Sequence, residues 1–415
     1  MNLIRLVALV FVGACGTSAA LATEPLRLEE AVSRALAAHP SIAAETAQLQ
    51  AVRARTQREA LPPPYTIGGE VENVAGNGNL RGIRSAETTL RIGRVIELGG
   101  KREARQTLGQ AELREQEHQA TKTRIDLASS TTARFIEVLA RQQRLTYAEE
   151  RIKQAERTRQ EVAAWVKAAR NPDSDLQAAE IAVAEAQLNR ENAEHELASA
   201  KMTLAASWGA TIPDFGEVVG DLQALPAVAP FETLAARLPM TPELWASRLR
   251  ANTIGARRRL AETEAKPNID VSLGVRRLEA YRDHAVVMSI SVPLGSPTRS
   301  GYAVSQANAE LAALEARRDA ERFERHQALF DKYQELTHAR HEAESLRTRM
   351  LPMAESALAT TRRGFEQGRF SYLSLGQAQR TLFDLRARAV EAATRYHLLL
   401  VEVERLTATV EDTAP

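Results

Sequence analysis

The chain has 415 residues, of which 54 are lysine or arginine and 53 are aspartate or glutamate, for a formal net charge of +1. This mixed charge gives no reason to expect a nucleic-acid partner, because proteins that bind nucleic acids concentrate basic residues on one surface. Aromatic residues make up only 5% of the chain, which argues against one compact globular core and favours long helices.

Residues 1–22 are predicted to be an export signal. A short positive segment ends at Arg5, and the apolar run that follows is too short to cross a bilayer as a helix. Two outcomes stay open: cleavage after Ala22, in the A-x-A sequence that ends there, or lipidation of Cys15, because residues 12–15 resemble a bacterial lipobox. No later stretch of about 18 apolar residues exists, which excludes a transmembrane helix in the mature chain.

Residues 26–209 are predicted to contain short helices, two strands and a long helical hairpin. The helices at 26–38 and 41–60 are each followed by proline, which ends them. The strands at 65–73 and 86–98 alternate apolar residues with small or polar ones. Each has about ten residues, the length of a strand that crosses a bilayer at a tilt.

The hairpin at 101–209 begins with an unusually long helix. No proline occurs from Lys101 to Asn171, and a helix of about 70 residues would be roughly 105 Å long. Pro172 stops it, and the returning helix carries a heptad-spaced apolar seam from residue 176 to residue 204, interrupted only by Arg190. Such a seam predicts two helices that pack along their whole length.

The same order of elements begins again after a proline-spaced connector at 210–239. Leu294-Gly295 repeats Leu98-Gly99, but the offset drifts by a few residues elsewhere, which indicates a structural rather than a strict sequence repeat. The predicted elements of this second repeat, residues 240–409, are a helix at 242–265, strands at 267–278 and 285–294, and a helical hairpin at 298–409, followed by a tail at 410–415. We expect a kink or step in the long helix at Pro352 and a second apolar seam from residue 375 to residue 406.

The strands predict an assembly of several chains. Four strands are too few to enclose a lumen, and an open sheet in lipid would leave unpaired edges. Three copies would give twelve strands, enough for a barrel with an aqueous channel that long helices extend outside the membrane. The alternatives are a soluble pair of β-hairpins packed on helices and, for the seams alone, an ordinary antiparallel coiled coil.

The predicted fold class is therefore α+β and mainly α. Long antiparallel coiled helical hairpins form an α-barrel, and four transmembrane β-strands per chain make a 12-stranded β-barrel in a trimer. The chain has an internal two-fold structural repeat.

This ordered set of elements resembles the TolC-type outer-membrane efflux factors over roughly residues 26–409. The doubled hairpins, the strand pairs and the turn at 368–371 carry the resemblance, and the segment 91–102 is similar to the strand-to-helix junction of the heavy-metal branch, typified by cobalt–zinc–cadmium and copper–silver resistance systems. The resemblance implies the outer membrane of a Gram-negative bacterium, with a large periplasmic portion. It also implies a homotrimer in outer-membrane lipid that docks a periplasmic adaptor (membrane fusion) protein and an inner-membrane RND pump.

Function in such a chain is expected to depend on geometry. We find no catalytic constellation, no cofactor motif and no metal site; His338 and His341 share a helix face but have no further ligands around them. The two hairpin turns are predicted to close the periplasmic end and to meet the adaptor, although the first lacks the glycine usual in the family. The predicted docking residues are Arg170, Asn171, Pro172, Asp173, Ser174, Gly368, Arg369, Phe370 and Ser371. Asp173, Asp175 and Arg369 are predicted to form charged rings at an aperture of the trimer.

The sequence thus predicts a passive duct of a tripartite efflux system that exports divalent heavy-metal cations, and not an enzyme. A first alternative keeps the duct but assigns it drugs or organic solutes as cargo. A second alternative, of another class, is a periplasmic coiled-coil scaffold without a channel.

Overall fold

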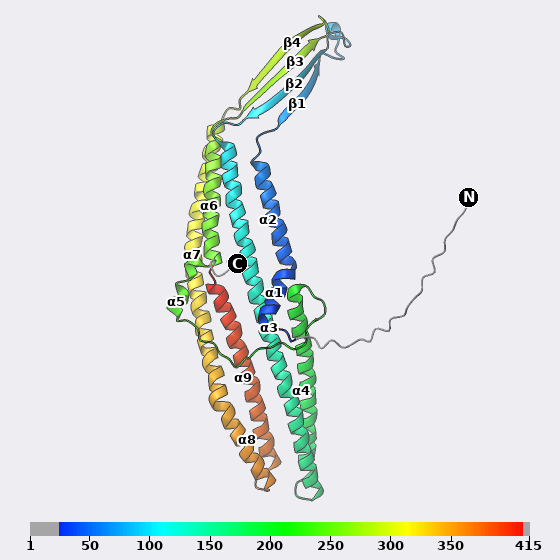
Figure 1. Cartoon of the computed structure of the whole chain (residues 1–415), viewed down its shortest axis with the longest axis vertical. Coiled ribbons are helices and arrows are strands. Elements are labelled where there is room, and N and C mark those ends of the chain that lie inside the picture. The colour runs from blue at the N-terminus through cyan, green and yellow to red at the C-terminus, as the bar shows by residue number, and fades with distance from the viewer. Residues whose placement is uncertain (1–24, 410–415) are drawn as a thin grey trace, which may run out of the picture.

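The computed structural model describes residues 25–409 and shows an elongated molecule, with a β-sheet at one end and long helices over the rest of its length (Figure 1). Cys15, Ala22 and the predicted tail at 410–415 lie outside the described residues. Within residues 25–409, no helix combines the length and the apolar character needed to span a membrane.

Two sets of helices and strands follow the same order along the chain. The first set comprises α1 (Leu28–Ala38), α2 (Pro40–Glu59), β1 (Tyr65–Glu72), β2 (Glu87–Ile96), α3 (Lys101–Lys167) and α4 (Asp173–Ala205). The second set comprises α6 (Pro242–Thr263), β3 (Ile269–Leu278), β4 (Asp283–Ser291), α7 (Ser296–Ser345), α8 (Leu351–Glu366) and α9 (Tyr372–Thr407). The connecting segments hold the short helix α5 (Phe231–Ala235) and 3₁₀ turns at Gly78–Leu80, Ala206–Trp208 and Leu238–Met240.

Some elements end earlier than the sequence predicts, for local reasons. Helix α3 stops at Lys167 instead of continuing to residue 171, because Ala169 takes the left-handed conformation with φ +56°. Strand β4 stops at Ser291 instead of residue 294, because Pro293 has no N–H to donate to a neighbouring strand.

The predicted step near Pro352 begins a few residues before the proline. Helix α7 ends at Ser345, residues Leu346–Met350 are π-helical, and α8 then starts at Leu351. A π-helical turn holds an extra residue, and Pro352 cannot donate the hydrogen bond that an α-helix needs. The long helix therefore continues through this point with its side chains shifted in phase.

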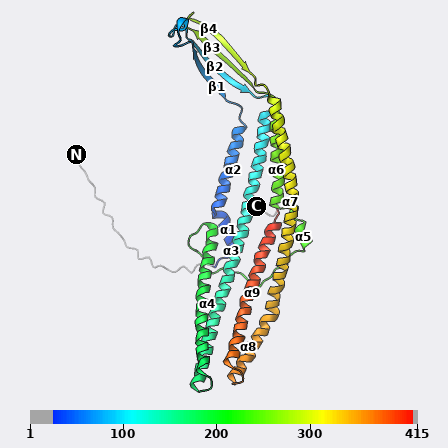
Figure 2. The same cartoon turned by 180° about the vertical axis from the view of Figure 1, so that it is seen from behind.

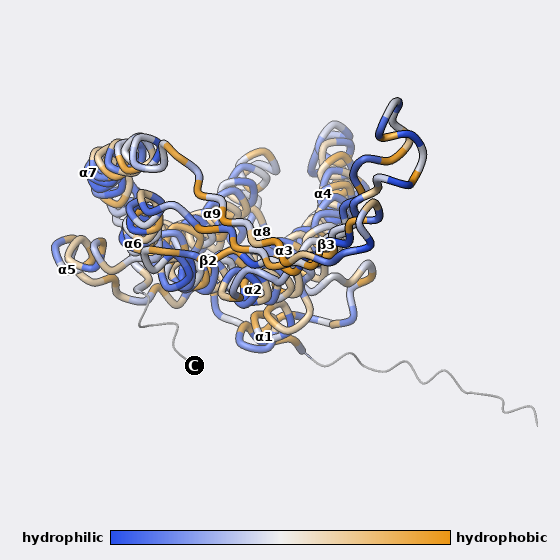
Figure 3. The backbone as a smooth tube through the Cα atoms, turned by 90° about the horizontal axis from the view of Figure 1, so that it is seen from above, coloured by the Kyte–Doolittle hydropathy of each residue, from blue (hydrophilic) through white to orange (hydrophobic). Residues whose placement is uncertain are grey.

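The helices form one curved layer. In the half nearer the sheet the order across the layer is α2, α3, α6 and α7; in the other half it is α4, α3, α9 and α8 (Figures 1 and 2). Among the helices of residues 25–409, only α3 and the continuous α7–α8 helix run through both halves. Viewed along the long axis, the layer is an arc with α7 and α4 at its ends and α1 and α5 on its outer side (Figure 3).

The two predicted seams hold this layer together. Every seventh residue of the α9 seam is at most 4% exposed: Leu375, Leu382, Ala389, Tyr396 and Val403. In α4 the buried positions at the same spacing are Ala179, Ala186 and Ala193. Alanine at these positions lets α4 approach α3 closely, which explains how two long helices pack with few large side chains.

The four strands form one antiparallel sheet in the order β1-β2-β3-β4. One face is apolar, and its side chains are aligned in rows across the strands, such as Ile67, Ile92, Leu273 and Met288. These four side chains are between 51% and 77% exposed. The opposite face is polar and carries ion pairs, including Arg91–Glu70 at 3.2 Å and Arg276–Glu87 at 2.8 Å.

The connector between the repeats packs across the helices. Val218 forms a β-bridge with Leu26, and both residues are buried. Further along, the Tyr396 hydroxyl donates to the Pro226 carbonyl, and the His397 ring nitrogen Nε2 lies 3.1 Å from the Leu222 carbonyl oxygen. Burial lowers the pKa of His397 below its ordinary value of 6.5, because the charged ring loses hydration.

This arrangement predicts an acid-sensitive step. A lowered pKa in the folded chain means that His397 contributes stability fully above about pH 6.5, and that the contribution is lost as the pH falls below that value. His397→Gln keeps an N–H donor but does not titrate. Between pH 7.5 and 5.5, we expect its Tm in circular dichroism melts to fall less than the Tm of the unchanged chain. The control is His195→Gln on α4, whose side chain is 79% exposed; equal pH dependence in all three proteins would contradict the assignment.

Candidate functional site: the paired hairpin tips

The two hairpin turns lie side by side at the end of the molecule farthest from the sheet (Figures 1 and 2). The α3–α4 turn spans residues 168–172, and the α8–α9 turn spans residues 367–371. All nine predicted docking residues therefore lie at one end of the chain, in or directly after these turns.

The α3–α4 turn is fixed by local hydrogen bonds instead of a glycine. The Arg170 amide donates to the Trp165 carbonyl at 2.9 Å, and the Asn171 side-chain amide donates to the Asp175 carboxylate at 2.7 Å. Pro172 sets the start of α4, and Asp173 and Asp175 lie in its first turn, where carboxylates interact favourably with the helix dipole.

The α8–α9 turn uses glycine. Gly368 has φ +71°, which L-residues rarely adopt, and the Arg369 amide donates to the Gly364 carbonyl at 2.8 Å. Ser371 caps α9, with its hydroxyl accepting from the Ser374 amide at 3.3 Å. The Arg369 side chain is exposed and forms no ion pair with any residue that the structure describes.

An aromatic stack joins the two turns. The rings of Trp165 and Phe365 are stacked with centroids 4.4 Å apart, and the Arg170 guanidinium lies 4.9 Å from the Trp165 centroid. Phe365 is completely buried. The Phe370 ring lies directly over Gly364, where an added Cβ would be 2.2 Å from it. Neither tip can therefore move far without separating this stack.

Sequence reasoning placed Gly364 and Phe365 in the second turn but assigned them no role there, and it did not identify Trp165 as part of the tip. The available signal was the scarcity of aromatic residues, since Trp165 and Phe365 each stand within six residues of a predicted turn. The sequence does not show that Trp165 and Phe365 are in contact, because they are 200 positions apart.

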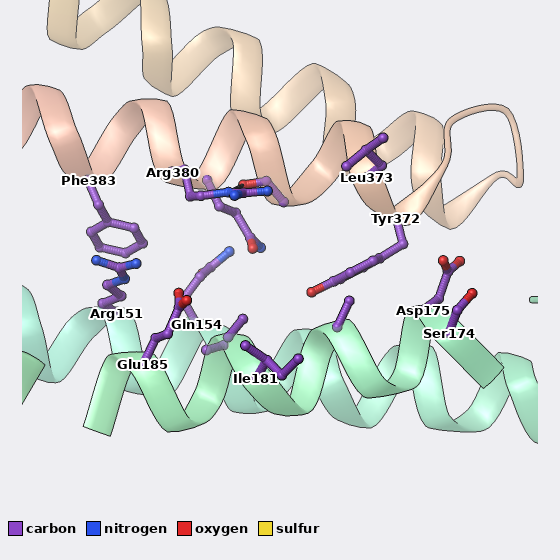
Figure 4. A pocket seen from close by; sticks show the side chains of 15 residues that line it. Arg151, Gln154, Ser174, Asp175, Ile181, Glu185, Tyr372, Leu373, Arg380 and Phe383 are labelled. Carbon is purple, nitrogen blue, oxygen red and sulfur yellow. Dashed lines mark hydrogen bonds between the residues drawn. The ribbon is translucent and has the colours of Figure 1, made fainter. Parts of the chain in front are cut away.

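A cavity of about 460 Å³ lies just inside the tips, between α4 and α9 with α3 at its base (Figure 4). Tyr372 extends from α9 into it, and burial raises the pKa of its hydroxyl. Arg380 and Glu185 face the cavity from opposite helices, and the Arg151 guanidinium lies 5.9 Å from the Phe383 ring. The cavity combines charged and aromatic walls without a cluster suited to catalysis.

The three predicted aperture residues occupy different places. Asp175 lines the cavity and is held by Asn171, whereas Asp173 and Arg369 are exposed on separate turns. Within one chain, the described residues include no ion pair among these three side chains. Among the residues that the structure describes, no group of three or more His, Cys, Asp or Glu could hold a metal ion.

Comparison with known proteins shows which proteins this chain is similar to. Residues 237–409 match the family model described as Outer membrane efflux protein. The Cobalt-zinc-cadmium resistance protein CzcC of Cupriavidus metallidurans is 29% identical over 388 residues, covering 93% of this chain and 90% of CzcC. The chain is therefore similar to outer membrane efflux proteins of TolC type, most directly over its second repeat.

Solved structures confirm the fold of this efflux protein. CusC superposes with a TM-score of 0.75 at 16% identity, covering 94% of this chain and 93% of CusC. The outer membrane protein VceC of Vibrio cholerae superposes with a TM-score of 0.74 at 15% identity, covering 92% of this chain and 96% of VceC. The predicted class, mainly helical with long helices and four antiparallel strands, is thereby confirmed.

The efflux protein is an outer-membrane channel with a periplasmic helical extension. Channels of the TolC family are trimers that work with the other parts of a tripartite efflux system. The match to a family of channels agrees with the prediction that the chain is not an enzyme.

The tip geometry makes a local prediction. Gly364→Ala would place a methyl group on the Phe370 ring and displace it, at a cost of about 1–3 kcal/mol. We expect trypsin to cleave after Arg369 at least about fivefold faster in this variant, because cleavage follows the population of the opened turn. Gly376→Ala in α9, where an added Cβ meets no atom within 4 Å, is the matched control and should be cleaved at the original rate. Equal cleavage of both variants would show that Phe370 does not hold the turn.

Proposed function

We propose that three copies of this efflux protein form one passive duct that exports divalent heavy-metal cations. The duct continues from a closed twelve-stranded sheet in the outer membrane into a cylinder of periplasmic helices. A periplasmic adaptor protein and an inner-membrane RND pump complete the system, and the pump supplies the energy.

One observation carries the trimeric closure: the free edges of the sheet and of the helical layer coincide. Strand β1 directly follows α2, and strand β4 leads directly into α7, and these two helices are the outer ones of the layer in the half nearer the sheet (Figure 1). Each of these strands has a neighbour on one side only. Backbone groups at such edges cannot stay unpaired in lipid, so β4 of one copy pairs with β1 of the next. The arc of Figure 3 then closes into a ring.

The two faces of the sheet support the same assembly. The exposed apolar rows fit contact with lipid chains, and the ion-paired face fits contact with water. A periplasmic scaffold without a channel does not explain an exposed apolar sheet face, on which the Ile67 side chain is 77% exposed.

The cargo is inferred from the sequence relative. CzcC is named a cobalt-zinc-cadmium resistance protein and aligns over nearly the whole chain. Drugs or organic solutes remain the competing cargo, since a passive duct passes what its pump delivers.

The tips are the proposed docking surface for the adaptor. Both turns end the molecule on the periplasmic side and expose side chains of different kinds, including Arg170, Asp173 and Arg369. Phe370 is 47% exposed and gives this polar surface one apolar contact. In a trimer each of these residues would appear three times around the axis.

Deletion of the gene tests the cargo. We expect the deletion strain to become sensitive to cobalt, zinc and cadmium while its sensitivity to dyes and detergents stays unchanged, measured as minimal inhibitory concentrations with and without the gene on a plasmid. Sensitivity to organic compounds alone would overturn the assignment of metal cations as cargo, but it would still agree with a duct.

Charge reversal tests the aperture. Asp173→Lys combined with Asp175→Lys replaces the acidic residues at the start of α4, and in a trimer it reverses six charges near the axis. We expect a higher single-channel conductance in planar bilayers, because the lysines would repel the Arg369 side chains of the other turn, which the aspartates attract, and the tips would open. Glu180→Lys, an exposed site further along α4, is the control; equal conductance in all three proteins would exclude Asp173 and Asp175 from the aperture.

A further inference from the structure

A second cavity, of about 560 Å³, lies on the apolar face of the sheet where the strands join the helices. Its wall is formed by Tyr65, Ile92, Ile96, Val271 and Leu273, which strand register places on this one face. Pro62, Pro63 and Arg102 close it at the end nearer the helices. The volume is in the usual range for small-molecule sites, and the wall is apolar.

Two guanidinium groups line this apolar cavity without a carboxylate partner. Arg94 donates to the Tyr65 hydroxyl at 3.1 Å and stacks 4.8 Å from the centre of its ring. Arg102 donates through Nε to the Ala60 carbonyl at 2.6 Å, which leaves its other nitrogens available. Among the described residues, neither group has a carboxylate oxygen within 4.0 Å.

The carboxylate that lines the cavity is hydrogen-bonded to a residue other than Arg94 and Arg102. Glu97 lines it, but both of its oxygens accept from Arg105, at 2.5 and 2.8 Å. The Glu97 carboxylate also attracts the charges of Lys101 and Arg102, but its hydrogen bonds go to Arg105. The cavity therefore presents two cations without a direct carboxylate partner among the described residues, at the boundary between an apolar face and the polar helical part.

We propose that this cavity binds a glycerophospholipid of the inner leaflet, with its phosphate between Arg94 and Arg102 and an acyl chain along Ile92 and Leu273. Guanidinium groups bind phosphate through paired, charge-assisted hydrogen bonds, and Tyr65 has the place and chemistry of an interfacial aromatic residue. The inference rests on the proposed insertion of the sheet into the outer membrane.

The internal repeat argues that the site is specific. Ile290 of β4 stands where the repeat offset would place the counterpart of Arg94, and it shares the row formed by Tyr65, Arg94 and Val271. The second repeat therefore has an aliphatic side chain where the first has a cation. A general requirement for cations at this depth would apply to both repeats, so we expect one lipid per chain and three per trimer.

Native mass spectrometry of the detergent-purified trimer tests the site. We expect the unchanged protein to retain three phosphatidylglycerol molecules and to bind dioleoylglycerol, which lacks phosphate, at least about tenfold more weakly. Arg94→Leu with Arg102→Gln should weaken phosphatidylglycerol binding by a similar factor. Arg91→Gln, on the same strand but the opposite face and paired with Glu70, should retain three lipids.

Each result decides the question. Equal binding of the two lipids by the unchanged protein, or undiminished phosphatidylglycerol binding by the double variant, would overturn the site. Displacement of the lipid by millimolar glycerol 3-phosphate alone would identify a free-phosphate site and overturn the lipid assignment. Trimer mass and bilayer conductance, measured on the same preparations, test the duct separately, because the unchanged protein can form a conducting trimer whether or not it retains lipid.

Discussion

Unsatisfied backbone hydrogen-bonding groups at the two edges of a four-stranded sheet are the constraint on which the rest of this structure depends. The sheet is too small to close on itself, and its apolar face is too exposed for water. Both problems have one solution, which is to place the face in lipid and pair the edges with further copies of the chain. The helical layer has free edges as well, and its outer helices α2 and α7 connect directly to the edge strands β1 and β4.

The long helices and the connector make this edge geometry rigid. Helix α3 runs from the strands to the tip without a break over 67 residues, so the position of the sheet is transmitted directly to the α3–α4 turn. In the second repeat, α7 and α8 together also extend from the strands to the tip, with a π-helical segment between them. The connector packs across both repeats through Val218, Leu222 and Pro226, and it fixes the two halves at mid-length.

Much of this could be predicted from residue patterns because the determinants are local. Alternation in the strands, prolines at helix ends and the heptad spacing from Leu375 to Val403 each act over a few residues, and the structure has the corresponding elements. The π-helical turn at Leu346–Met350 could not be predicted, since its residues favour an ordinary α-helix equally well. The sequence located the step only through Pro352.

The candidate site was predictable in position but not in construction. Proline and glycine located both turns, yet the stack of Trp165 on Phe365 depends on how two distant hairpins meet. The same is true of Arg94, which in the sequence only interrupts an apolar pattern. Its significance appears when the strand register places it beside Tyr65 and the fold brings Arg102 to the same cavity.

Amide hydrogen exchange of the lipid-embedded protein, followed strand by strand, tests the edge pairing most directly. If neighbouring copies close the sheet, the amides of β1 and β4 will be protected as strongly as those of the central strands β2 and β3. Exchange in β1 and β4 that is as fast as in exposed loops, while β2 and β3 stay protected, would mean that the edges are free and would contradict the account.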